Sequence, residues 1–314
     1  MRLSTLRDGT PDGRLLIVSP DATRFASAPV PTLQQLLEQW EAHAATCRDV
    51  SDFPDALDPQ TLAAPLPRAW QWLDGSAYDS HGALMDQVFG ITPERTGLPL
   101  MYQGLSDRFY GPFDDVPLPS EELGIDFEGE FGVIVGAVPM GTPAEAALDY
   151  VRLVVQINDW SLRALAGLEM KTGFGWVQAK PACAMAGIAV TPDELGDVWR
   201  DGRVCADLRV DWNGERFGQP NGAPMAFGFH ELIAHAARTR ALPAGTIIGS
   251  GTVSNANFRE VGSTCIAERR GIEIVDEGAA RTGFMRFGDL VRMEALLPDG
   301  RAPFGVIEQR VVQG

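Results

Sequence analysis

The sequence predicts an α+β fold in which β-strands predominate. Residues 125–136 alternate acidic and apolar side chains with the period of a strand, and residues 151–158 form a second, mainly apolar strand. Amphipathic helix patterns occupy two segments, 31–40 and 229–240, whereas further strand-like runs occur within 10–30, 264–269 and 285–294. Strands are therefore expected to carry most of the core.

Composition indicates an ordinary globular chain with an acidic surface. The chain has 314 residues, with 45% hydrophobic and 22% charged side chains, which predicts one or two domains. Its net charge of -16 would repel nucleic acid phosphates and anionic lipids. A small molecule is therefore the expected partner, and neither nucleic acid nor membrane is expected.

The N-terminal residues contain no apolar segment typical of a signal peptide, and no apolar run approaches the length of a membrane span. These observations predict a cytoplasmic protein. The four cysteines lack CxxC spacing, so neither a zinc site nor a disulfide framework is expected. The four histidines are too dispersed for a His-rich metal motif.

The first 70 residues predict a hairpin, a helix and a connection. Residues 10–30 contain two short β-prone runs around a Pro-Asp turn. The helix over 31–40 begins with Thr32, and Gln35 follows at the spacing of a capping box. Four prolines between residues 54 and 67 then indicate a connection from a small N-terminal domain to a larger one.

Asp74 and His81 lie seven positions apart at the start of the larger part. Spacing alone says little about them, because a lone histidine that opens an apolar segment is more often structural than catalytic. Residues 98–104, which include Tyr102, follow, and a turn-rich acidic loop then leads into the acidic strand.

The strand over 125–136 places Asp126, Glu128 and Glu130 on one face, with apolar residues on the other. The two glutamates are expected about 6–7 Å apart at Cβ. Ionised carboxylates that close repel each other unless water or a cation screens them, and Mg²⁺ or Ca²⁺ takes oxygen ligands. The alternative is a half-exposed strand with a hydrated acidic face.

Two further polar residues follow the acidic strand. Asp159 ends the apolar strand over 151–158, where it could be a metal ligand or the N-cap of the next segment. Lys180 lies in a Gly-rich, apolar stretch, although most isolated lysines are simply solvated.

The C-terminal half predicts a helix over 229–240, whose His230 and His235 are expected to be structural. Small residues over 247–255 would allow the backbone to approach a ligand closely. Residues 264–269 read as a strand, and residues 285–294 read as a terminal hairpin.

Five segments together resemble the fumarylacetoacetate hydrolase family, and the resemblance extends from about residue 70 to the C-terminus. The segments are DFEGE (126–130), NDWSLR (158–163), LPLMYQG (98–104), QAKP (178–181) and GSGTVS (249–254). This resemblance implies a mixed β-sandwich roll at 70–314, a small barrel-like N-terminal domain at 1–69, and a homodimer.

The resemblance also implies the site residues. A Mg²⁺ or Ca²⁺ ion would be bound by four carboxylates, those of Asp74, Glu128, Glu130 and Asp159. For catalysis it implies that His81 activates water with Glu268 as its partner, that Arg163 and Lys180 stabilise an oxyanion, and that Tyr102, Thr252 and Arg163 contact substrate.

Three positions depart from the family pattern. Ala166 stands where a glutamine helps to form the oxyanion hole in the animal enzyme, and Cys183 and Ala184 replace small polar residues. The spacing from Thr252 to Glu268 is also about two residues longer than in that enzyme. These departures bear more on the identity of the substrate than on the reaction class.

The resulting hypothesis is a metal-dependent hydrolase that cleaves a carbon–carbon bond in a β-diketo acid. Fumarylacetoacetate, cleaved to fumarate and acetoacetate in tyrosine and phenylalanine catabolism, is the first expected substrate. An acylpyruvate hydrolase or β-keto acid decarboxylase of the same family is the first alternative. A non-catalytic, metal-stabilised binding protein is the second, and it would not require His81, Lys180 and Arg163 together.

Overall fold

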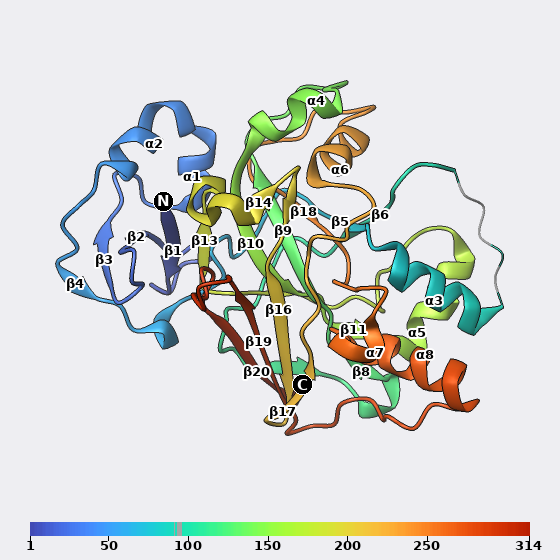
Figure 1. Cartoon of the computed structure of the whole chain (residues 1–314). Helices are drawn as coiled ribbons and strands as arrows, with labels where there is room; N and C mark the ends of the chain where they lie inside the picture. The colour runs from blue at the N-terminus through green and yellow to red at the C-terminus, as the bar shows by residue number, and fades with distance from the viewer. Residues whose placement is uncertain (91, 93–95) are drawn as a thin grey trace.

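The computed structural model describes residues 1–90, 92 and 96–314, and its centre is one large, mixed sheet of eleven strands (Figure 1). Most neighbouring strands are antiparallel, but β18 and β5 run parallel. The strand order is β4-β3-β2-β1-β13-β10-β9-β18-β5-β6, and β12 pairs with β10 off this path. The bounds are β1 (Arg2–Leu6), β2 (Arg14–Val18), β3 (Arg24–Ser27), β4 (Asp55–Ala56), β5 (Trp72–Ser76), β6 (Leu100–Gly104), β9 (Gly129–Val135), β10 (Val151–Asn158), β12 (Ala184–Met185), β13 (Ile188–Val190) and β18 (Thr246–Gly249).

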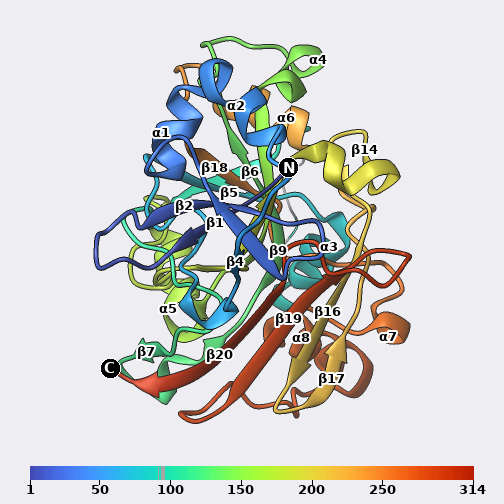
Figure 2. The same cartoon turned by 90° about the vertical axis from the view of Figure 1, so that its left-hand side faces the viewer.

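A second sheet of five strands has the order β17-β16-β19-β20-β7 (Figure 2). Apolar residues of both sheets belong to one buried cluster, so the sheets pack face to face. Buried Gln156 of β10 also joins them, because its amide donates to Met293 O at 3.1 Å and accepts from Ala295 N at 2.8 Å. The bounds are β7 (Val116–Leu118), β16 (Asp207–Trp212), β17 (Glu215–Gly218), β19 (Leu290–Leu296) and β20 (Val306–Gln313), with two small pairs formed by β8 (Ile125–Asp126) with β11 (Ser161–Leu162) and β14 (Trp199–Arg200) with β15 (Arg203–Val204).

Helices cover the edges of the large sheet. Figure 1 shows α3, α5, α7 and α8 on the side of the molecule away from β1–β4. The α-helices are α1 (Leu33–Glu38), α2 (Trp40–Arg48), α3 (Asp79–Phe89), α4 (Ala144–Ala147), α5 (Arg163–Thr172), α6 (Phe229–Ala236), α7 (Phe258–Val261) and α8 (Ile266–Glu277). Short 3₁₀ turns occupy Pro59–Thr61, Glu121–Leu123, Leu148–Tyr150 and Pro192–Val198.

This architecture confirms the predicted α+β class. The N-terminal hairpin forms from β2 and β3, and Thr32 caps α1 by accepting from Gln35 N at 3.2 Å. Strands β1–β4 continue the large sheet through β13, with no closed barrel among residues 1–90, 92 and 96–314. The division into 1–69 and 70–314 stays a prediction.

Three predicted elements differ from the structure. Residues 266–277 form α8 rather than a strand, because a short run with few apolar residues does not distinguish the two, and helical contacts continue well beyond residue 269. The terminal hairpin pairs β19 with β20, so its turn follows residue 296. The predicted strand over 125–136 is interrupted between β8 and β9.

In the described part of the chain, none of the helices has both the length and the hydropathy required to cross a bilayer.

Candidate functional site

Three buried carboxylates converge from strands in the middle of the large sheet, where β10 and β9 are neighbours and β18 separates β9 from β5. Asp74 lies on β5, Glu130 lies on β9, and Asp159 directly follows β10. One carboxylate oxygen of each lies within 4.8 Å of the others, which is a spacing that allows a metal ion to bind. Gly249 of β18 leaves room for this group, because a Cβ there would lie 2.4 Å from Asp74 Oδ1.

The carboxylate of Glu130 is a buried polar group that would normally form hydrogen bonds or bind a cation. The residue is fully buried, and among the residues that the structure describes neither of its oxygens has a hydrogen-bond partner. Burying an ionised carboxylate without a partner is costly, and a divalent cation with oxygen ligands would relieve that cost. The three carboxylates therefore fit a hard metal ion.

Burial and mutual repulsion change the pKa values of these three carboxylates. Burial, and then the neighbouring acids, raises the pKa of Asp74 and of Glu130 well above the usual range. Burial also raises the pKa of Asp159, against the attraction of Lys180. A cation at the centre of the group would oppose these shifts by stabilising the charged forms.

Glu128 lies beside these three carboxylates, and its two oxygens bind two cationic side chains. Arg163 Nη2 lies 2.5 Å from Oε1, and Lys180 Nζ lies 2.6 Å from Oε2. Although burial opposes ionisation, Lys180 and Arg163 lower the pKa of Glu128 below its usual range. Its part in a four-carboxylate metal site stays a prediction.

The three acids of the predicted strand are all buried, so the alternative of a hydrated acidic face is wrong. Asp126 and Glu128 are 0% and 5% exposed. Two of these side chains instead share the Arg163 guanidinium, since Arg163 Nε lies 2.7 Å from Asp126 Oδ2. The sequence could not show this, because a strand pattern does not reveal what packs over it.

Lys180 is buried rather than solvated, which corrects the ordinary expectation for an isolated lysine. Its Nζ bridges Glu128 Oε2 and Asp159 Oδ2, both at 2.6 Å. Burial opposes the charge, but Asp159 and Glu128 raise the pKa of Lys180 above its usual range. The ammonium also lies over the rings of Tyr102 and Trp176, at 5.7 and 5.6 Å.

Asp159 does not cap a helix. The N-cap residue of α5 is Leu162, and it makes no side-chain cap bond. Instead the Asp159 carboxylate accepts from Tyr102 Oη at 2.8 Å and from Cys183 Sγ at 2.9 Å, besides binding Lys180. Cys183 was noted in the sequence only as a departure from the family pattern, and its position three residues after Lys180 is the one signal of its role.

His81 and Glu268 face each other from two helices. His81 lies in the first turn of α3, and its Nδ1 is 3.5 Å from Oε1 of the fully buried Glu268 on α8. Ser254 donates to the same oxygen, and Ser80 donates to Ser254 at 2.8 Å. His81 Nδ1 has no hydrogen-bond partner, so its orientation is set by packing and charge.

The backbone after β18 approaches the carboxylates, as the small residues there predicted. Gly251 donates its N–H to Asp74 Oδ1 at 3.2 Å and has a φ of 75°. A Cβ on Gly251 would lie 2.4 Å from Gly75 O, so glycine is required. Thr252 follows directly and is 6% exposed.

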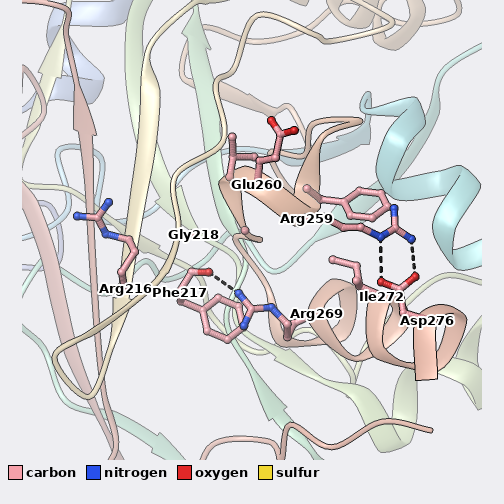
Figure 3. Close-up of a pocket in the computed structure, with 11 residues that line it drawn as sticks. Arg216, Phe217, Gly218, Arg259, Glu260, Arg269, Ile272 and Asp276 are labelled. Atoms are coloured by element: carbon pink, nitrogen blue, oxygen red, sulfur yellow. Dashed lines mark hydrogen bonds and ion pairs between the residues drawn. The ribbon is translucent and has the colours of Figure 1, made fainter. Parts of the chain in front are cut away.

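A separate surface pocket of about 530 Å³ lies between β17, α7 and α8 (Figure 3). None of the carboxylates described above lines it. Its arginines already have partners: Arg259 binds Asp276 at 2.6 Å, and Arg269 donates to Phe217 O at 2.6 Å. The buried carboxylates, rather than this pocket, are therefore the candidate functional site. The sequence did not predict this pocket.

Family models match almost the whole chain. A model described as fumarylacetoacetate (FAA) hydrolase C-terminal matches residues 71–312. The chain belongs to the fumarylacetoacetate hydrolase family. A second model, described as fumarylacetoacetase N-terminal domain 2, matches residues 1–68.

Curated members of the fumarylacetoacetate hydrolase family align over part of their length. A 2,4-didehydro-3-deoxy-L-rhamnonate hydrolase from Sphingomonas sp. (strain SKA58) is 30% identical over 157 residues, which covers 49% of this chain and 52% of that protein. The chain spans about half to two thirds of the length of the curated relatives it matches.

Solved structures share the fold over the full chain. A maleylpyruvate hydrolase from Sphingobium sp. SYK-6, in complex with manganese(II) and pyruvate, has a TM-score of 0.66 at 19% identity, and covers 100% of both chains. A 5-carboxymethyl-2-hydroxymuconate delta-isomerase from Mycobacterium smegmatis has a TM-score of 0.62 at 19% identity, with 100% of this chain and 99% of that chain covered. At these identities the likeness concerns the fold alone.

Proposed function

We propose that this protein is a metal-dependent hydrolase that cleaves the carbon–carbon bond between the carbonyls of a β-diketo acid. The observation that carries the proposal is the unpartnered, fully buried carboxylate of Glu130 among Asp74 and Asp159. A His–Glu pair, with His81 Nδ1 3.5 Å from Glu268 Oε1, lies close by, because Cys265, which precedes the helix of Glu268, forms a β-bridge with Glu128. The site thus combines ligands for a cation with a candidate general base.

The proposed metal is a divalent ion that prefers oxygen, with Mg²⁺, Mn²⁺ and Ca²⁺ as candidates. Asp74, Glu130 and Asp159 would bind it, and Glu128 is the proposed fourth carboxylate. Manganese in the maleylpyruvate hydrolase structure supports a divalent ion without choosing among these candidates. When bound, such an ion would supply Lewis-acid polarisation of the substrate carbonyls.

The protein residues would perform the proton transfers and stabilise charge. His81 would accept a proton from water while Glu268 stabilises the imidazolium that forms. The hydroxide would add to a substrate carbonyl carbon, and Lys180 and Arg163 would stabilise the negative charge of the tetrahedral intermediate. The carbon–carbon bond would then break, and the proton held by His81 would pass to the leaving carbanion. Tyr102 and Thr252 are proposed substrate contacts, and Tyr102 also donates to Asp159.

The most favoured substrates are acylpyruvates, with fumarylacetoacetate as the next candidate. Pyruvate bound in the maleylpyruvate hydrolase supports the acylpyruvate class. The departures at Ala166 and Cys183 favour a substrate other than that of the animal enzyme.

Turnover on a substrate panel tests the proposed function. The panel contains maleylpyruvate, fumarylpyruvate, fumarylacetoacetate and a simple β-keto acid, each with Mg²⁺, Mn²⁺, Ca²⁺ or EDTA. Metal-dependent release of pyruvate or acetoacetate supports hydrolysis. Carbon dioxide release would favour the decarboxylase, and double-bond migration without cleavage would favour an isomerase. Metal binding without turnover of any substrate would favour the binding protein.

We also predict a homodimer. The family resemblance first suggested it, and an apolar surface on and after α5 now supports it, because helix α5 has no buried residue. The apolar side chains exposed there are Leu168, Met170, Phe174 and Val177. Light scattering should give about twice the chain mass of 33.9 kDa. A mass equal to that of one chain, independent of concentration, would count against the dimer.

A further inference from the structure

The carboxylate of Asp126 links two parts of the site that are far apart in the sequence. The residue is fully buried at the end of β8. Its Oδ1 accepts from Ile266 N at 2.7 Å, and its Oδ2 accepts from Ala267 N at 2.9 Å. The same Oδ2 accepts from Arg163 Nε at 2.7 Å. One side chain therefore binds the start of α8 and the start of α5.

At α8, Asp126 acts as a cap supplied from a distant strand. The first N–H groups of a helix have no partner within the helix, and a carboxylate stabilises that end. The local N-cap residue, Cys265, offers a sulfur that accepts only from Glu268 N, at 3.3 Å. Glu268 is the third residue of α8, so the bonds to Ile266 and Ala267 hold the turn that carries it.

At α5, the same carboxylate orients a cation. Because Nε of Arg163 binds Asp126, the Nη2 end of the guanidinium is directed to Glu128 Oε1, at 2.5 Å. Guanidinium geometry is a rigid, planar fork, so fixing one edge fixes the direction of the other. Asp126 thereby determines where Arg163 presents its charge.

We infer that Asp126 is a positioning residue that holds the Glu268–His81 pair and Arg163 at a fixed separation across the site. It touches neither substrate nor the proposed metal, and it acts through the two groups that it binds. This inference rests on the proposed function, because it gives a catalytic role to the distance between His81, the proposed base, and Arg163, the cation proposed to stabilise the oxyanion. A bond network that only stabilised the fold would not affect turnover in the folded protein.

The test is Asp126→Asn, which keeps the shape but replaces one oxygen with an NH₂ group. That group cannot accept hydrogen bonds, so the variant loses either the bond from Ile266 N or both of the bonds from Ala267 N and Arg163 Nε. We expect kcat to fall by about 10- to 100-fold, the usual effect of an outer partner of a site residue. Affinity for Mn²⁺ is measured by calorimetry for each variant, so that kcat is compared at saturating metal.

A double-mutant cycle with Arg163→Lys then shows whether Asp126 acts through Arg163. If it does, Asp126→Asn should lower kcat much less in the lysine background than in wild type, because coupled residues are not additive. Full additivity would overturn the link to Arg163.

A second variant, Asp126→Ser, also removes the link. Its single, shorter hydroxyl cannot bind the first turn of α8 and Arg163 together. Its kcat should also fall, so a folded Asp126→Ser decides the matter if Asp126→Asn does not fold. Glu273→Gln is the matched control, because Glu273 also lies on α8 and also accepts from two backbone N–H groups, at 2.6 and 2.9 Å. Its kcat should equal that of wild type.

The possible results distinguish the role of Asp126 from the proposed function. If wild type turns over the substrate panel and folded Asp126→Asn and Asp126→Ser are as active, the inference is wrong and the proposed function stands. If wild type turns over no substrate, the proposed function fails, and the catalytic purpose assigned to Asp126 fails with it. Support requires an active wild type and reduced kcat, at saturating Mn²⁺, in both folded variants.

Discussion

His81→Ala should lower kcat by roughly 10²- to 10⁴-fold, which is the usual contribution of general acid–base catalysis. The reason is that His81 Nδ1 lies 3.5 Å from Glu268 Oε1, so a carboxylate is in place to stabilise the imidazolium when the ring accepts a proton from water. The acidic limb of the pH–rate profile should also disappear, because that limb reflects protonation of the base.

Steady-state kinetics over a range of pH, with calorimetry for the metal, measures these effects. Metal affinity should be unchanged, since His81 is not a proposed ligand. His43→Ala is a suitable control, because His43 bonds only Gln39 on the outside of the N-terminal segment, at 3.1 Å. Full hydrolysis by the His81 variant would make this histidine structural and would contradict its proposed role as the general base.

Glu130→Gln should abolish high-affinity metal binding and metal-dependent activity together. Glu130 lies between Asp74 and Asp159 and has no protein partner for either oxygen, so the metal is its expected partner. Calorimetry with Mg²⁺ and Mn²⁺ measures the loss of affinity. Glu294→Gln is the control, because Glu294 is a strand residue bound to Arg292 at 2.7 Å and is not part of the carboxylate group.

Without metal, in contrast, Glu130→Gln should be the more stable protein at higher pH. Burial and the neighbouring acids raise the pKa of Glu130, so its charged form destabilises the folded state. Metal-free wild type should therefore lose stability as pH rises above the ordinary carboxyl range and through the raised pKa values of this group. Metal-free Glu130→Gln should lose less.

Adding metal should raise the Tm of wild type by mass action, but not that of Glu130→Gln. Thermal melts with EDTA or with Mn²⁺ at several pH values measure both effects. A variant that binds Mg²⁺ like wild type, or that gains the same Tm with metal, would show that Glu130 is not a ligand.

The sequence was sufficient to predict those elements that depend on interactions between neighbouring residues. The hairpin of β2 and β3, the cap at Thr32 and the strand β10 formed as predicted, since turn chemistry and side-chain period act over a few positions. Residues 264–269 were misread as a strand, because the carboxylate that caps α8 comes from Asp126, about 140 positions away.

Within the candidate site, the family resemblance implied one group of four acids, and three of them, Asp74, Glu130 and Asp159, lie together in the structure. The sequence did not reveal that Lys180 is buried, or that Asp126 binds Arg163. The side chain of Asp126 shares a strand face with the glutamates, and face sharing predicts proximity without predicting partners.

The sequence by itself determined the α+β class, the acidic character and the identity of the chemical groups, because composition, periodicity and motif are properties of the chain. The tertiary structure decided which carboxylates have cations as partners and which have none. Glu128 is bound by Arg163 and Lys180, while Glu130, two residues away, is buried without a partner. The physical reason is that burial and charge pairing are set by segments packed from elsewhere in the chain, and these decide whether a buried acid is stabilised as an ion or requires a metal.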